Sequence, residues 1–119
     1  VTGVITRISV ATGGGQATGG GSSLPRLSAN GRWVVFLSTS TNMVAGDTNG
    51  VSDVFLHDRV LGTTVRVSVD SAGGEQNAAS LEQPSVTESG RFVAFSSTGS
   101  NLVAGDTNPA VDVFLRDLG

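Results

Sequence analysis

The chain has 119 residues and no cysteine, and 14% charged residues give it a formal net charge of −3. The absence of cysteine excludes disulfides, thiolate metal ligands and cysteine nucleophiles. All seven basic residues are scattered arginines, without the clusters that nucleic-acid binding requires, and no apolar run approaches the ~18 residues of a membrane span. We therefore expect a folded, soluble chain with no nucleic-acid or membrane partner.

A tandem repeat determines how the elements are read. Shifting the chain by 59 residues aligns it with itself without a gap, and 26 of the 60 aligned pairs are identical. The longest shared run, Val-Ala-Gly-Asp-Thr-Asn, occupies residues 44–49 and 103–108. Self-similarity at a fixed period indicates a repeat architecture. Each copy is therefore expected to form the same structural unit.

The predicted elements are short β-strands, and no segment has the 3.6-residue apolar period of a helix. The first is an isolated outer strand at residues 4–10, which match the strand at 63–69. In 63–69, Arg66 and Ser68 alternate with valines, which is typical of a half-exposed outer strand. The full set, in chain order, is 4–10, 24–28, 32–39, 52–58 and 63–69, followed by 83–87, 91–98 and 111–117.

The central strands carry apolar residues at adjacent as well as alternate positions, so both faces of each sheet must be covered. Four-stranded antiparallel sheets that are covered on both faces and repeat in tandem describe the blades of a β-propeller. The predicted fold is therefore all-β, with two propeller blades over residues 1–119. Blade one spans 24–69, the first three strands of blade two span 83–117, and residues 1–10 complete a blade of a neighbouring chain.

The repeat also resembles a known family. The pattern P-x-x-S-x-x-G-R-x-V-x-F-x-S, followed by N-x-V-A-G-D-T-N-G-x-x-D-V-F-L-x-D and T-x-R-V-S-V, is similar to the WD-repeat-like bacterial propeller repeats of the TolB family. The second copy departs from it at Pro109 and at residues 87–89. The resemblance implies a propeller, usually of six or more blades, of a kind that is often exported to the periplasm or outside the cell and often serves as a protein-binding platform. It does not imply an enzyme.

Two blades cannot close a propeller, because propellers have roughly four to eight. The strand at 4–10 is therefore predicted to complete a blade of another copy, which gives a homotrimer of six blades or, as the second choice, a homotetramer of eight. A misfolded or aggregated two-blade fragment is the alternative. We expect the chain to be an excised or engineered piece of a longer repeat protein.

One group of oxygen-bearing side chains is a candidate metal site. Hard cations such as calcium bind clusters of oxygen ligands, although the spacing here is shorter than in known calcium loops. The alternative is structural, with Asp and Asn bonding their own loop backbone in Asx turns. The candidate ligands are Asp47, Asn49 and Asp53 in the first copy and Asp106, Asn108 and Asp112 in the second.

Other polar residues are interpreted as structural. Asp58 and Asp117 are expected to start hairpins by accepting backbone N–H bonds. Arg32 and Arg91 are expected to pair with an aspartate across the blade interface. His57 is arginine in the other copy and has no serine partner nearby, so we expect a solvated or interface side chain rather than a catalytic base.

The long links between strands are predicted to lie at one end of the propeller, where function most often resides. They comprise residues 11–23, 40–51, 70–82 and 99–110. No catalytic constellation accompanies them, so the predicted function is a non-enzymatic scaffold or binding module assembled as a homo-oligomeric ring. A calcium-stabilised propeller is the first alternative, and a hydrolase is the second.

Overall fold

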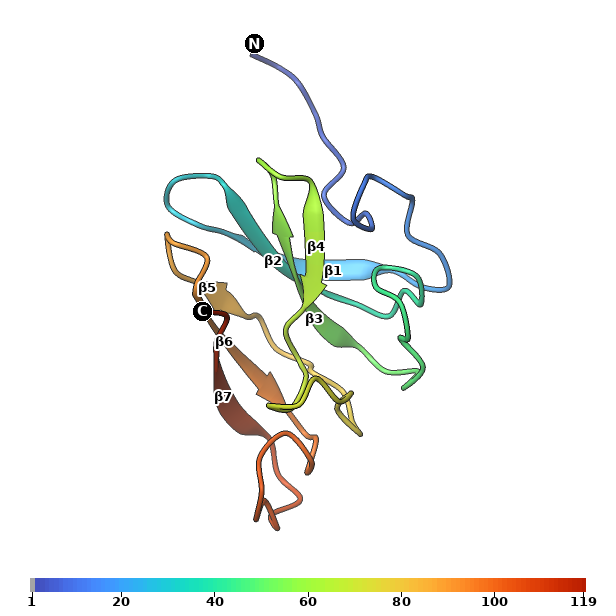
Figure 1. The fold of residues 1–119 in the computed structure, drawn as a ribbon, viewed down its shortest axis with the longest axis vertical. Coiled ribbons are helices and arrows are strands. Elements are labelled where there is room, and N and C mark those ends of the chain that lie inside the picture. The colour runs from blue at the N-terminus through green and yellow to red at the C-terminus, as the bar shows by residue number, and fades with distance from the viewer. Residues whose placement is uncertain (1) are drawn as a thin grey trace.

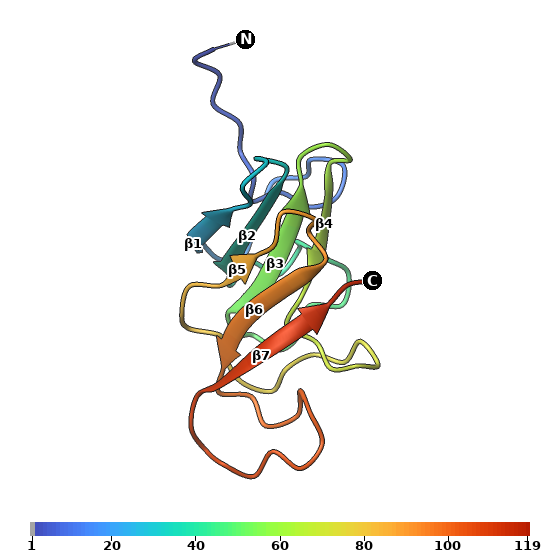
Figure 2. The same ribbon diagram turned by 90° about the vertical axis from the view of Figure 1, so that its left-hand side faces the viewer.

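A computed structural model describes residues 2–119 as two antiparallel β-sheets without a helix (Figures 1 and 2). Residues 2–119 therefore contain no helix that could cross a membrane. Val1, the first residue of the predicted 1–10 segment, lies outside the described residues. Sheet one consists of β1 (Ser22–Leu27), β2 (Trp33–Ser38), β3 (Asp53–Asp58) and β4 (Thr63–Arg66), and sheet two of β5 (Ser85–Val86), β6 (Phe92–Ser97) and β7 (Asp112–Asp117).

In each sheet, neighbours in sequence are neighbours in space. This arrangement confirms an all-β chain of short antiparallel strands in the predicted order. The expected strand at 4–10 does not form within this single chain: among its described residues only Val10 makes a bridge, to Gln16. The predicted partner of residues 4–10 is a second chain, so their pairing with a neighbouring copy stays a prediction.

Strand β1 begins earlier than the strand predicted at 24–28, and its pairing is irregular. Its pairing with β2 shifts register between Ser23 and Arg26, and Leu24 has a φ of +53°. Pro25 has no N–H to donate to the ladder, and strands accommodate proline at such bulges. The bulge allows β1 to run from Ser22 past the proline, so the predicted start at residue 24 was wrong.

Both faces of sheet one are buried. The first face carries Val34, Phe36 and Phe55, which pack with Met43. The second face, formed by the alternate positions of the same strands, is apolar as well and lies in one cluster with residues of sheet two. This explains the adjacent apolar residues in the sequence, each of which gains about 1.5–3 kcal/mol from full burial. The second face consists of Val35, Leu37, Val54 and Leu56.

The two sheets pack in a directional way. The second face of sheet one contacts Val93 and Phe95 of sheet two, and the repeat matches these residues to Val34 and Phe36 of sheet one's first face. The second face of one repeat therefore packs on the first face of the next. The second face of sheet two is left uncovered at β7, where Val113 is 80% exposed and Leu115 is 69% exposed.

Trp33 and Gly90 form a close contact between the sheets. Trp33 packs against the shared apolar cluster, and its ring fills the position that a Cβ at Gly90 would need. Gly90 also has a φ of +73° in the turn before β6. Only glycine combines this backbone conformation with such a close approach of a neighbouring ring.

Candidate functional site

Three of the long loops, at 40–51, 70–82 and 99–110, contact one another in chain order. The N–H and hydroxyl of Thr48, in the loop between β2 and β3, bond to Glu75 in the link between the sheets. The same link reaches forward to sheet two, where the N–H of Asn77 donates to Asn101 Oδ1 (2.9 Å). The link at 70–82 therefore joins the loop that precedes it to the loop that follows it.

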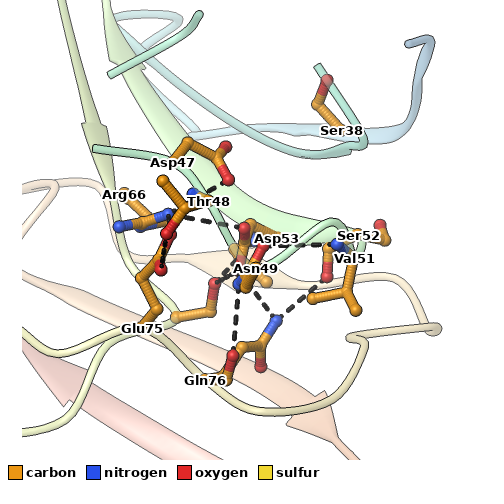
Figure 3. Close-up of polar contacts among 12 residues, drawn as sticks. Ser38, Asp47, Thr48, Asn49, Val51, Ser52, Asp53, Arg66, Glu75 and Gln76 are labelled. Carbon is orange, nitrogen blue, oxygen red and sulfur yellow. Dashed lines mark hydrogen bonds and ion pairs between the residues drawn. The ribbon is translucent and has the colours of Figure 1, made fainter. Parts of the chain in front are cut away.

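An arginine lies among three carboxylates where these loops meet (Figure 3). Arg66 is the last residue of β4 and Asp53 the first of β3, while Asp47 and Glu75 come from the two loops. Arg66 Nη1 lies 2.9 Å from Glu75 Oε1, 3.4 Å from Asp47 Oδ1 and 3.6 Å from Asp53 Oδ2. We call these four residues the Arg66 cluster.

Asp53 connects the cluster to the rest of the fold. Its Oδ1 accepts hydrogen bonds from Ser68 Oγ (2.9 Å), Gln76 Nε2 (3.0 Å) and Asn49 Nδ2 (3.1 Å). Its Oδ2 is buried without a hydrogen-bond donor and faces the Arg66 guanidinium. A fully buried carboxylate is tolerated only with such partners, so Arg66 compensates a charge that the fold has already buried.

The other two carboxylates lie in contrasting environments. Glu75 accepts bonds from the Thr48 N–H (2.6 Å) and hydroxyl (2.7 Å), and these bonds, aided by Arg66, lower the pKa of Glu75 to about 2. Burial raises the pKa of Asp47, as do the nearby charges of Asp53 and Glu75, while Arg66 opposes the rise. The cluster therefore carries more negative than positive charge and depends on its guanidinium.

The second copy has the same loop without an arginine. Asn108 Nδ2 donates to Asp112 Oδ1 (3.1 Å), and Asn108 Oδ1 accepts the Ala110 N–H (2.9 Å), as Asn49 does with Asp53 and the Val51 N–H. Within residues 2–119, neither Asp106 nor Asp112 forms an ion pair. Both line an open depression formed by residues 103–108 and the start of β7.

The structure brings the predicted calcium ligands together in each copy, but not as a set of converging oxygens. Asn49 turns its NH₂ toward Asp53, and its oxygen accepts a backbone N–H two residues later, which is an Asx turn. Arg66 occupies the position between Asp47 and Asp53. No group of three or more acidic, histidine or cysteine side chains is arranged for a metal in the described part of the chain. Calcium binding stays the alternative to a structural role for these residues.

Sequence reasoning missed Glu75 and Gln76 and did not place Arg66 and Ser68. A half-exposed strand was predicted at 63–69, and in the structure the Arg66 side chain is 9% exposed and Ser68 is fully buried. The outward residue is Val65. Glu75 and Gln76 were overlooked because their role depends on two loops meeting. The usable signal was the match of Arg66 and Ser68 with Arg7 and Ser9 in the repeat.

The hairpin aspartates behave as predicted, while their arginine partners do not. Asp58 Oδ1 accepts the N–H groups of Val60 and Leu61 and thereby starts the β3–β4 turn. Arg32 binds both oxygens of this aspartate (2.9 and 2.6 Å) within one sheet rather than across an interface. The register explains the correction, because the residue after Arg32 pairs directly with Asp58. Arg91 and Asp117 repeat the pair in sheet two.

His57 is buried, so of the two predicted positions, solvated or at an interface, the solvated one was wrong. Its Nδ1 lies 2.8 Å from Thr64 Oγ1, and that hydroxyl donates to the carbonyl of Val10. Burial lowers the pKa of His57 below its ordinary value. This histidine therefore lies where the N-terminal segment is joined to sheet one, next to the start of the 11–23 link, whose Thr12 also bonds to Thr64.

No family model matches this sequence, and comparisons with curated proteins and with solved structures give no match. The resemblance to TolB-like repeats therefore rests on the residues quoted above.

Proposed function

We propose that this chain is a non-enzymatic scaffold: two blades of a β-propeller that assemble with identical copies into a closed ring. Three chains would make six blades, and four would make eight. The ring would present the loops at 40–51, 70–82 and 99–110 to a binding partner at one end. In the first copy the carboxylates of Asp47, Asp53 and Glu75 are engaged with Arg66 rather than set out as an acid and a base.

The directional packing of the two sheets carries this proposal. Sheet one uses its second face to cover the first face of sheet two, and sheet two keeps its own second face exposed at Val113 and Leu115. A contact between two different faces is heterologous, so it repeats from copy to copy until the rotation closes. The contact within one chain therefore supplies a pattern for the contact between chains.

The shape of the single chain fits this mode of assembly. The sheets are stacked along a molecule of 50 × 29 × 22 Å, with the N-terminal segment at one end and β7 toward the other (Figures 1 and 2). The free second face of sheet two and the first face of sheet one thus point away from each other. Each end can meet the opposite end of another copy.

The test is the mass of the chain in solution, measured by light scattering during size-exclusion chromatography. The proposal predicts three or four times the chain mass of 12.0 kDa. Val113→Glu should reduce this mass because it places a charge in the proposed contact. Val60→Glu alters another exposed valine, in the β3–β4 turn, and should leave the mass unchanged. A monomer mass for the unaltered chain would refute the proposal.

A further inference from the structure

The outer edge of β7 has no strand beside it. In sheet one, β3 pairs with β4 from Phe55↔Arg66 to Asp58↔Thr63. In sheet two, β7 has the same residues as β3 at most positions, yet within residues 2–119 it pairs with β6 alone. An unpaired edge of this kind is a template for a further strand. Sheet two therefore has a place for the equivalent of β4.

The N-terminal segment already has the local geometry of the chain that follows β4. Val10 bridges Gln16 as Val69 bridges Glu75, and these two bridges are one repeat apart. The turn within each segment closes with the same backbone bond, at 2.8 Å in the first copy and 2.9 Å in the second. Ile8 packs on the first face of sheet one, as Val67 packs on the first face of sheet two.

The residues just before this anchored stretch have no partner strand. Val4 is 66% exposed and Ile5 is 97% exposed, so both side chains are free to pack in a further contact. Figures 1 and 2 both place this segment at the far end of the long axis from β7. The segment lies apart from its own β7, so we assign the pairing of the two to another copy.

The charges of the two surfaces are complementary. The repeat matches Arg7 to Arg66, and it matches Asp106 and Asp112 to the Asp47 and Asp53 that Arg66 contacts. Arg7 is exposed, and neither Asp106 nor Asp112 has an ion-pair partner in the described chain. The N-terminal end thus holds an arginine and the β7 end holds two aspartates, which together would repeat the contacts of Arg66 with Asp47 and Asp53.

We propose that residues 4–10 of one copy pair antiparallel with β7 of the next, with Arg7 placed between Asp106 and Asp112. This inference rests on the proposed ring and specifies its joint. The β3–β4 register transfers residue by residue, so Arg7 lies opposite Phe114 and Thr6 opposite Leu115. The hydroxyl of Ser9 takes the place of Ser68 Oγ, which donates to Asp53 and accepts the Val54 N–H.

The contact of residues 4–10 with β7 of another copy would be weaker than the contact of β4 with β3 within a chain. Gln16 and Ala17 stand where the first site has Glu75 and Gln76. Arg7 would therefore face two carboxylates instead of three, and Asp112 would lack the hydrogen bond that Gln76 gives Asp53. Because this joint relies more heavily on one ion pair, raising the salt concentration should dissociate the ring before it unfolds the chain.

Paired cysteines test the register directly, because the chain has no cysteine of its own. Residues opposite each other in an antiparallel pair lie within disulfide range, so Thr6→Cys combined with Leu115→Cys should oxidise to covalent trimers or tetramers. The matched control, Ile5→Cys with Leu115→Cys, is one residue out of register. Its side chains should lie on opposite faces and cross-link poorly.

Arg7→Gln tests the ion pair separately. It should raise the concentration at which the ring dissociates by about tenfold or more, because it leaves two carboxylates without their cation. Arg26→Gln removes an exposed arginine that forms no ion pair or side-chain hydrogen bond in the described structure, and it should have little effect.

The outcomes separate this inference from the proposed function. Selective cross-linking of the Thr6–Leu115 pair, together with dissociation caused by Arg7→Gln alone, would support both. A ring of normal mass in which both cysteine pairs react alike, or in which both arginine variants behave alike, would overturn the proposed joint and leave the ring. A monomer at every concentration would overturn both.

Discussion

Replacing Arg66 with glutamine should destabilise the fold strongly, because three carboxylates then lose their guanidinium. The side chains of Asp53, Asp47 and Arg66 are 0%, 4% and 9% exposed. Removing one partner of a buried ion pair costs about 3–5 kcal/mol. Glu75, the nearest carboxylate at 2.9 Å, is 23% exposed and partly solvated, so we take the lower end and expect a loss of about 3 kcal/mol.

The assay is urea unfolding at pH 7 and fixed protein concentration, since assembly adds to apparent stability. Trp33 is the single tryptophan and packs between the sheets, so its fluorescence reports the loss of this contact. With a slope of about 1–3 kcal/mol per molar urea, a loss of about 3 kcal/mol should lower the midpoint by roughly 1–3 M. Arg26→Gln, the matched exposed variant, should change stability by no more than about 0.5 kcal/mol.

Lowering the pH provides a second readout of the same change. The pKa of Asp47 is already raised by burial and by Asp53, and loss of Arg66 should raise it further. Protonation of Asp47 then relieves the repulsion, so the deficit of Arg66→Gln relative to the unaltered chain should shrink as the pH falls from 7 toward 4. Equal stabilities for Arg66→Gln and Arg26→Gln at pH 7 would refute the assigned role of the cluster.

Three further predictions follow from the structure. Gly90→Ala should cost about 1–3 kcal/mol more than Gly105→Ala in thermal unfolding, because both sites have positive φ but only the first Cβ would collide with the tryptophan ring; equal losses would contradict this packing. Hydrogen bonding lowers the pKa of Glu75 from 4.5 to about 2, so its contribution to stability should be complete above pH 4.5 and lost as the pH falls toward 2. Thr48→Val should flatten the dependence of stability on pH between 4.5 and 2. An unchanged dependence would contradict the role assigned to the Thr48–Glu75 hydrogen bonds. Millimolar calcium should produce neither titration heat nor a thermal shift, whereas a chelator-sensitive shift that Asp106→Ala abolishes would establish the metal site instead.

Much of the fold could be predicted because the repeat supplied every element twice. The strands β2, β3, β6 and β7 lie within their predicted ranges, and their adjacent apolar residues indicated the two covered faces. The β1 bulge could not be predicted. A proline removes one N–H donor from the hydrogen bonds between strands, but its presence does not show how the pairing continues beyond it. The second-copy inner strand shrinks to Ser85–Val86 for reasons that its sequence does not reveal.

The site was harder to predict because its chemistry depends on contacts between distant loops. The acidic and amide residues were found from their spacing. The pairing of Asp53 with Arg66 and Gln76 depends on how β4 and the link between the sheets return to the start of β3. Alternation along 63–69 predicted one exposed face, but Val67 of one face and Ser68 of the other are both fully buried. Alternation does not reveal this, because a polar or charged residue can be buried wherever other groups compensate it.

A crystal structure of the 119-residue chain would test the central claim most directly, because it would show the sheets and the N-terminal segment at the same time. We predict a closed ring of six or eight four-stranded sheets, in which residues 4–10 of each copy pair with β7 of its neighbour and Arg7 contacts Asp106 and Asp112. Separate two-sheet molecules, with the edge of β7 open and residues 4–10 unpaired, would contradict it.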